Sequence, residues 1–426
     1  MEEFELIIER CQRQEILFAD NPSRLTLNKL SSEINDSLKR YKIKIWRNHA
    51  VEPLVDYIDI YTSLNGYYLD YQFSDYDDTL SFNEINESDL NVLWIDLERY
   101  DINNLEDWIN WFYLRIKDLR ELVKSPILII TLEKGEKIFK LIKESLSVFA
   151  GVFVANIFSS MISSNISIYE KRYEQISGTC LNKKIHILVA RLFACQWLPT
   201  LLFEPIKAVA VDLDNTLYSG ILGEDGSKNL VISKGHIALQ NFLKKLKEKG
   251  VFLILISKNE MKDVHNLFND RSDLILQLDD FSHLEVSWDE KSIGLKRSAK
   301  SLNISVNSIL FVDDNIGELS SVWINDKSFK AIHAKEDAFL TLNALRFFPG
   351  IWRWNVNKDD FLRTFDMNSQ NERNKLLNNS QSIENYLSSL KVELTYNYDF
   401  KKELKRLFEL SRKTNQFNFS LRRTSE

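Results

Sequence analysis

The most constraining feature of this chain is a short apolar run that ends in two aspartates. Residues 208–217 read Ala-Val-Ala-Val-Asp-Leu-Asp-Asn-Thr-Leu. A short, wholly apolar run of this kind is typical of a strand that is buried on both faces of a sheet. Asp212 and Asp214 would then place a nucleophile beside a proton donor where the strand ends. The run alone is a weak signal, because buried strands often end in aspartate.

Three later elements strengthen this interpretation, because they follow in order at regular spacing. They are Ser257-Lys258-Asn259 after the apolar run 251–256, Lys291 within Trp288-Asp289-Glu290-Lys291, and Asp313-Asp314-Asn315 after the apolar run 309–312. From Asp212 to Ser257, Lys291 and Asp313 the successive separations are 45, 34 and 22 residues. Each separation is about right for a helical crossover between parallel strands.

Helical periodicity between these runs predicts the architecture. The first intervening segment repeats Leu239, Phe242, Leu243 and Leu246 at helical spacing and stops at Gly250. A second apolar face recurs within 261–268, before the apolar run 274–276, which is expected to form the next strand. Strands that alternate with amphipathic helices indicate an α/β fold with a doubly wound parallel sheet, which binds ligands at the carboxyl ends of its strands.

Together, the four elements resemble the signatures of the haloacid-dehalogenase (HAD) phosphotransferase superfamily. A closer resemblance, to the FkbH-like family of HAD subfamily IIIC, rests on the longer stretch 212–226 and on Lys-Thr-Asn-Gln-Phe-Asn at 413–418. It runs from about residue 205 to the last residue, and more loosely across the N-terminal half. It implies a Rossmann-like HAD domain with a minimal cap.

The resemblance implies a role for each carboxylate. Asp212 would attack phosphorus and form an aspartyl-phosphate, and Asp214 would protonate the leaving oxygen. Mg²⁺ would bind the carboxylates of Asp212 and Asp314 and the backbone carbonyl of Asp214. Asp314 is preferred to Asp313 because it aligns with the aspartate of the family's usual Gly-Asp pair.

The remaining motif residues would bind the phosphoryl group. Ser257, Lys258 and Asn259 are expected to contact phosphate oxygens, with backbone N–H groups at the start of a helix assisting. Lys291 would neutralise the transferring group and the Asp212 carboxylate. The alternative for any one of these residues is a structural role, as a helix cap or a solvated lysine.

Two departures from the FkbH-like pattern narrow the expected activity. Relatives that load glyceryl onto an acyl carrier protein hold the acyl group on a cysteine before Ser-Lys-Asn, where this chain has Ile256. The only cysteines are Cys11, Cys180 and Cys195, so none lies beyond residue 205. Tyr218 also stands where those relatives usually have tryptophan. Both departures favour phosphoryl hydrolysis or transfer over carrier loading.

The short spacing between motifs leaves no room for a large cap domain. The segment 220–233 is expected to form a β-hairpin flap. An open site suits a phosphate on a bulky molecule, such as a carrier-protein arm, a nucleotide-sugar or a glycan. Alternatively, the N-terminal domain covers the site as a lid.

The N-terminal residues predict a second α/β unit. Strands are expected near residues 43, 92–97 and 126–132, and the unit resembles the SGNH-hydrolase-like domain that precedes subfamily IIIC modules. The Gly-Asp-Ser and Asp-x-x-His motifs of esterases with that fold are missing from the sequence. Asn48 and His49 lie where a first loop could bind a ligand, although such residues are usually turn formers. We expect a non-catalytic recognition or lid element.

These patterns divide the chain into five parts. They are an SGNH-like unit with a helical start (1–165), a helical linker (166–204), the HAD-like domain (205–335), a helical extension (336–390) and the start of a truncated acetyltransferase-like (GNAT) domain (391–426). The last part has too few residues to close that fold, so we expect no acyl-CoA chemistry.

Composition limits the classes of partner. The net charge of the 426 residues is −6 and no basic stripe stands out, which argues against nucleic acid. The acidic start does not resemble a signal peptide, and the most apolar stretch, 148–161, is too short to span a bilayer. Three scattered cysteines indicate a reducing compartment, and six histidines without metal-ligand spacing are expected at surface or capping positions. We therefore expect a cytoplasmic protein that acts on a phosphorylated small molecule, away from membranes.

Three functions remain open from the sequence. The first is a Mg²⁺-dependent phosphohydrolase or phosphotransferase that acts on a phosphoester of a secondary-metabolite or glycan pathway. The second is an enzyme that uses an acyl phosphate to load an acyl carrier protein. The third is a non-catalytic interaction protein.

Overall fold

The computed structural model describes residues 11–20, 22–31, 39–83, 85–161, 167–170, 172, 174–327 and 329–354, and the single residues 393 and 396. The chain divides into two units, Met1–Met367 and Asn368–Glu426. All helices and strands given below belong to the first unit. The predictions for residues 355–390 and for the GNAT-like segment 391–426 lie outside the described residues, apart from Glu393 and Tyr396.

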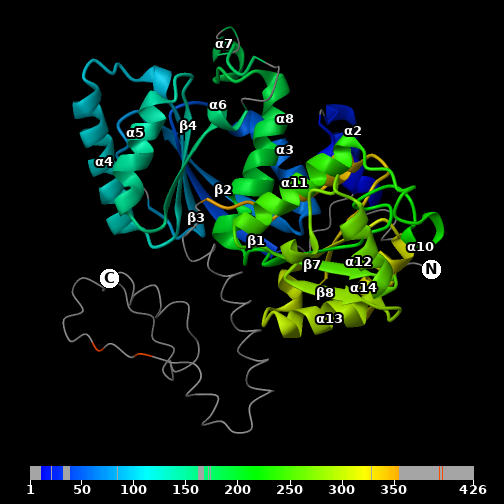
Figure 1. The fold of residues 1–426 in the computed structure, drawn as a ribbon. Coiled ribbons are helices and arrows are strands. Elements are labelled where there is room, and N and C mark those ends of the chain that lie inside the picture. The colour runs from blue at the N-terminus through cyan, green and yellow to red at the C-terminus, as the bar shows by residue number, and fades with distance from the viewer. Residues whose placement is uncertain are drawn as a thin grey trace. The chain divides into compact units, whose positions relative to one another are not determined.

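The first sheet has five parallel strands in the order β2-β1-β3-β4-β5. The strands are β1 (Lys39–Arg47), β2 (Tyr67–Tyr76), β3 (Leu90–Asp96), β4 (Ile127–Leu132) and β5 (Val152–Asn156). In Figure 1, α3 (Glu52–Leu64) and α8 (Lys183–Leu192) lie on one side of this sheet and α4 (Leu105–Leu122) and α5 (Lys137–Ser145) on the other. The expected second α/β unit is confirmed, and the segment predicted as a linker contributes α8 to one of its layers.

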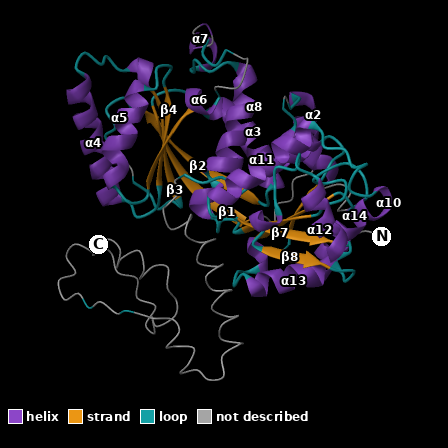
Figure 2. Ribbon diagram, in the orientation of Figure 1, coloured by secondary structure: helices purple, strands orange, loops and turns teal. Residues whose placement is uncertain are grey.

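The second sheet carries the predicted motifs. It is also parallel and five-stranded, in the order β10-β9-β6-β7-β8. Its strands are β6 (Ala208–Val211), β7 (Phe252–Ser257), β8 (His283–Val286), β9 (Ile309–Asp313) and β10 (Lys330–His333). Figure 2 shows strands of both sheets in orange with helices packed beside them.

Alternation along the strands explains why this sheet is covered on both faces. Val209 and Val211 of β6 belong to the core cluster that includes residues of α11 (Lys234–Glu248) and α12 (Met261–Asp270). Ala208 and Ala210 belong to the cluster built with α13 (Lys291–Ser301) and α14 (Ile316–Asn325). Successive side chains of a strand point to opposite faces, so an entirely apolar strand requires helices on both sides.

Shorter elements complete the unit. They are α2 (Arg24–Ser31), α6 (Ile157–Ser160), α7 (Glu174–Ser177), the π-helical turn Phe193–Trp197, α9 (Pro199–Leu202), α10 (Leu222–Asp225) and α15 (Ala338–Arg346), with 3₁₀ turns at Leu97–Arg99, Leu146–Val148, Leu278–Asp280 and Val306–Ser308. Helix α15 packs against α11, so the layer that covers the second sheet extends beyond residue 335.

Two local expectations were wrong. The apolar run 274–276 is not a strand, because the buried Gln240 side chain accepts the backbone N–H groups of Ile275 (2.8 Å) and Leu276 (3.2 Å). The neighbour of β7 is instead β8. The segment 220–233 is not a β-hairpin: a single antiparallel bridge between Ser219 and Val231 closes a loop that contains α10.

Within the described part of the chain, one helical stretch is long and apolar enough to cross a membrane. This stretch, Lys183–Leu202, has 83% of its most apolar window buried inside the protein. Such burial is typical of a core helix, so this stretch is weak evidence for a membrane span.

Candidate active site

The candidate site lies where three neighbouring strands end. Strand β6 lies between β7 and β9, so Asp212, Ser257 and Asp313 meet at one edge of the sheet. The Asp212 N–H donates to the Val312 carbonyl (3.0 Å), which fixes Asp212 beside the end of β9. The helices that follow β6 and β9 cover opposite faces of the sheet. This is the topological switch point at which doubly wound sheets bind ligands.

Lys291 joins two of the carboxylates at this edge. Its buried ammonium lies 2.9 Å from Asp212 Oδ1 and 2.5 Å from Asp313 Oδ2. Burial lowers the pKa of Lys291, but the two carboxylates raise it above its ordinary value, so the side chain stays protonated. Lys291 is the first residue of α13, where the helix dipole disfavours a cation. A residue that opposes this local preference and contacts two carboxylates is typical of a functional position.

Asp212, Asp313 and Asp314 form a cluster that fits a divalent cation. Each offers one carboxylate oxygen, and these oxygens lie within 4.8 Å of one another. Because Lys291 occupies Asp212 Oδ1 and Asp313 Oδ2, the second oxygen of Asp212 and the carboxylate of Asp314 are the better placed for a metal. Clustered carboxylate oxygens are the donors that Mg²⁺ prefers.

Burial and mutual repulsion raise the pKa values of these acids. For Asp212, burial is the largest cause, the charge of Asp313 adds to it, and Lys291 opposes both. The pKa of Asp314 is raised by burial and then by Asp212. Without a cation, the cluster therefore holds negative charge at an energetic cost. A divalent ion bound there would relieve that cost.

Asp214 is held in one orientation by three donors. Its Oδ1 accepts hydrogen bonds from the Tyr218 hydroxyl (2.8 Å) and the Leu222 N–H (2.9 Å), and its Oδ2 accepts one from the Asn259 side-chain amide (2.9 Å). A carboxylate oxygen has two lone pairs, so Oδ1 is fully used. Oδ2 is then the oxygen with a lone pair left for proton exchange.

The Ser-Lys-Asn motif divides between two environments. Ser257 is buried, and its hydroxyl oxygen accepts a hydrogen bond from Asn259, which leaves the hydroxyl proton available to another acceptor. The ammonium of Lys258 instead forms an ion pair with Glu318 (2.6 Å) in the first turn of α14. Phosphate binding by Ser257, Lys258 and Asn259 stays a prediction.

Sequence reasoning missed three residues that position the site. In the sequence, Tyr218 is only a departure from a family pattern, yet its hydroxyl donates a hydrogen bond to Asp214. Asn215 has a left-handed φ of 51°, which asparagine tolerates better than most residues, and its side chain binds both the Gly220 N–H and the Asp314 carboxylate. Asparagine directly after Asp-x-Asp could have indicated this turn.

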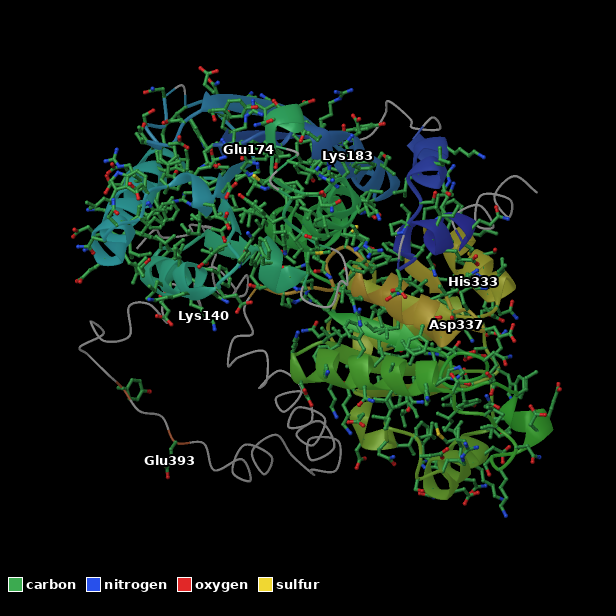
Figure 3. All side chains as sticks on the ribbon, turned by 90° about the horizontal axis from the view of Figure 1, so that it is seen from above. Lys140, Glu174, Lys183, His333, Asp337 and Glu393 are labelled. Carbon is green, nitrogen blue, oxygen red and sulfur yellow. The ribbon has the colours of Figure 1, made fainter. Side chains whose placement is uncertain are left out.

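His333, the third missed residue, ends β10 and is labelled in Figure 3. Burial lowers its pKa, so the ring is neutral, and its Nε2 lies 2.9 Å from the Asp314 carbonyl. The expectation that every histidine lies at the surface or caps a helix was therefore wrong. His49 and His186 are buried as well.

Tyr218→Phe removes the hydrogen bond from the Tyr218 hydroxyl to the Asp214 carboxylate. We expect it to lower the kcat of the reaction at this site about tenfold, and the free energy of unfolding by about 1–2 kcal/mol. Steady-state kinetics and denaturant unfolding measure the two effects. Tyr67→Phe is the matched control. Tyr67 lies on β2 of the first sheet, and its buried hydroxyl donates to the Ala194 carbonyl (2.8 Å). It should lose stability with kcat unchanged. An unchanged kcat in Tyr218→Phe would show that Tyr218 does not position Asp214.

Comparisons with known proteins bear on the fold. The sequence matches no protein-family model and no curated protein. The structure is similar to that of the N-terminal part of the protein BF1531 from Bacteroides fragilis, which contains a phosphatase domain and is complexed with Mg. The identity is 19%, the TM-score is 0.58, and the alignment covers 76% of this chain and 98% of that chain. At 19% identity, this similarity supports a shared fold alone.

A second solved structure aligns over less of the chain. It is 3-deoxy-D-manno-octulosonate 8-phosphate phosphatase from Moraxella catarrhalis, in complex with magnesium, phosphate and KDO. The identity is again 19%, with 38% of this chain and 93% of that chain covered. Its TM-score of 0.25 is too low to argue a shared fold.

Proposed function

We propose that this chain is a Mg²⁺-dependent phosphohydrolase or phosphotransferase that acts through an aspartyl-phosphate on Asp212. The observation that carries the proposal is the arrangement of charge around this residue. Asp212 Oδ1 contacts Lys291 and is proposed to attack, the second oxygen of Asp212 and the carboxylate of Asp314 are left for Mg²⁺, and the carboxylate of Asp214 is held in place for proton transfer. The magnesium-bound phosphatase domain of the similar BF1531 structure supports the same reaction class.

Asp212 and Asp214 carry out the chemical steps of the proposed reaction. Asp212 attacks the phosphorus of a phosphomonoester, the bond from phosphorus to the ester oxygen breaks, and Asp214 gives its proton to that oxygen. Asp214 then takes a proton from a water molecule, which attacks the aspartyl-phosphate and releases phosphate and free Asp212. Lys291 offsets negative charge on the transferring group throughout. Asp212 and Asp314 would hold Mg²⁺, which would supply further charge compensation.

Finer assignments are part of the proposal. On the strength of the FkbH-like resemblance, we propose that the substrate is a phosphoester of a secondary-metabolite or glycan pathway. The N-terminal unit is proposed to be SGNH-like and to serve as a recognition or lid element. Its strand order, β2-β1-β3-β4-β5, is a common order of doubly wound domains and supports that choice.

The two alternative functions are less well supported. One edge of the sheet brings together a buried lysine, three clustered carboxylates, and Asp214 with its three hydrogen bonds. A non-catalytic role does not explain this arrangement. Loading of an acyl carrier protein needs a reactive thiol near the site, and position 256 is a buried isoleucine within a core cluster.

The cysteines elsewhere in the chain are poor nucleophiles. Burial is the main cause that raises the pKa of Cys180 to about 11 and of Cys195 to about 12, so both are thiols near neutral pH. The thiolate is the reactive form. Cys11 belongs to the second sheet's core cluster, packed with Trp323 and Phe329.

We therefore predict no covalent acyl-enzyme when the protein is mixed with an acyl phosphate such as bisphosphoglycerate, although phosphate can still be released. Intact-protein mass spectrometry measures this. An adduct of glyceryl mass that disappears in Cys11→Ala, Cys180→Ala or Cys195→Ala would favour carrier loading instead.

Phosphate release tests the proposed function. The full-length protein is mixed with small phosphomonoesters in Mg²⁺ and then in excess chelator. We expect release with Mg²⁺ and its loss with chelator, restored when Mg²⁺ is added back. Release that persists in chelator would contradict a Mg²⁺-dependent reaction.

A further inference from the structure

Three exposed apolar side chains lie on the segments that follow β6, β7 and β8 at the site edge of the second sheet. They are Ile221 (39% exposed), Met261 (38%) and Trp288 (68%), and we call this set the apolar rim. Single exposed apolar residues are normal on protein surfaces. What distinguishes this set is that each member follows a different strand end of the site.

Hydrogen bonds connect the apolar rim to Asp214. The N–H of Leu222, next to Ile221, donates to Asp214 Oδ1 (2.9 Å). Asn259, two residues before Met261, donates to Asp214 Oδ2 (2.9 Å).

Trp288 and the two helices complete the connection. The Trp288 indole N–H donates to the side chain of Glu260 (2.9 Å), the residue between Asn259 and Met261. Helix α10, which starts next to Ile221, packs against α12, which starts at Met261. The three apolar residues therefore lie on segments that are hydrogen-bonded to Asp214 or joined to those segments.

Asp214 is the group that protonates the leaving oxygen in the proposed reaction, so the rim would contact the leaving alcohol and not the phosphoryl group. We infer that the substrate is a phosphomonoester of an uncharged alcohol with an apolar stretch next to the ester oxygen. This inference rests on the proposed function. The Glu260 carboxylate beside Trp288 would also repel a leaving group that carries further phosphates.

A series of straight-chain alkyl phosphates tests the inference, because leaving-group basicity hardly changes from methyl to hexyl while apolar area grows. Full burial of one methylene group strengthens binding about fourfold. An apolar rim that covers one side of the alkyl chain should raise kcat/KM about twofold for each added methylene. We expect kcat/KM for hexyl phosphate to exceed that for methyl phosphate about 30-fold. Glucose 6-phosphate, a polar alcohol of similar size, should be a poorer substrate than hexyl phosphate.

Variants assign the preference to the rim. Trp288→Ala should lower the hexyl-to-methyl ratio to about fivefold or less, whereas Trp288→Phe, which keeps an aromatic face, should retain most of it. Ile324→Ala is the matched control. Ile324 is 54% exposed near the end of α14, at the opposite edge of the sheet, and its loss should leave the ratio unchanged.

The outcomes separate the inference from the proposed function. Hydrolysis of methyl phosphate without a preference for hexyl, or faster turnover of glucose 6-phosphate than of hexyl phosphate, would overturn the apolar substrate class while leaving the function standing. If no ester is hydrolysed, the proposed function fails. Calorimetric binding of hexylphosphonate and methylphosphonate in Mg²⁺ then still measures the rim, and equal affinities would overturn it.

Discussion

Replacement of Asp212 by asparagine should reduce phosphate release about 10⁴-fold or more, with the fold retained. Asparagine keeps the shape of the side chain but cannot form the aspartyl-phosphate, and removing a nucleophile costs several powers of ten in rate. The fold should survive, because the loss of the Lys291 ion pair is offset by relief of repulsion between Asp212 and Asp313. Turnover measurements and thermal unfolding of the same preparation measure both effects.

Asp280→Asn is the matched control for this variant. Asp280 is also a buried aspartate paired with lysine, 2.8 Å from Lys247, but it lies in a 3₁₀ turn away from the strand ends of the site. The control should lose some stability and keep its turnover. An Asp212→Asn protein that remains active would end the covalent mechanism.

The second large effect is expected at the two adjacent aspartates that follow β9. Asp314→Asn should weaken Mg²⁺ binding about 100-fold or more, because a carboxylate ligand is lost from a site with few protein ligands. Asp313→Asn should weaken it less than about tenfold, because the Asp313 side chain is already used. Its Oδ2 accepts from Lys291 and its Oδ1 from the Asn315 N–H (2.8 Å).

The free energy of unfolding should fall more in Asp313→Asn than in Asp314→Asn. Asp313→Asn removes the shorter of the two Lys291 ion pairs (2.5 Å against 2.9 Å), so we expect its free energy of unfolding to fall by about 1–3 kcal/mol even though repulsion with Asp212 is relieved. Asp314→Asn should lower the free energy of unfolding less, because Asp314 is only half-buried. Titration calorimetry with Mg²⁺ and denaturant unfolding of both variants measure the comparison. Weaker Mg²⁺ binding in Asp313→Asn than in Asp314→Asn would reverse the assignment of the metal ligand.

Local patterns in the sequence were sufficient to predict the strands of the second sheet that carry the site. The runs 208–211, 251–256 and 309–312 are apolar throughout and each ends in polar residues, and such a pattern has few interpretations other than a doubly buried parallel strand. Because parallel strands end at the same edge, the proximity of Asp212, Ser257 and Asp313 followed from the pattern.

Contacts between distant residues could not be predicted in the same way. Nothing near residues 274–276 indicates that Gln240, more than 30 positions earlier, satisfies their backbone N–H groups and prevents a strand. Likewise, His333 reaches the Asp314 carbonyl only because β10 pairs with β9. These interactions depend on tertiary packing and leave no periodic signal in the sequence.

The division of labour between Asp313 and Asp314 shows the same limit at a finer scale. The two residues are chemically identical and adjacent, and only their directions at the end of β9 decide which one meets Lys291. The preference for Asp314 as metal ligand rests on the resemblance to the family's motif, and the contacts of Asp313 with Lys291 and Asn315 supply an independent physical reason for it.

The most direct test of the covalent mechanism is to locate the phosphorylated residue. A crystal structure of the full-length protein with Mg²⁺ and beryllium fluoride, which mimics a phosphoryl group bound to a carboxylate, would make the acceptor visible. The proposed mechanism predicts BeF₃⁻ on Asp212 Oδ1, the oxygen that contacts Lys291, with Mg²⁺ between the other oxygen of Asp212 and Asp314. Beryllium fluoride bound to any other residue, or Mg²⁺ bound away from Asp314, would contradict it.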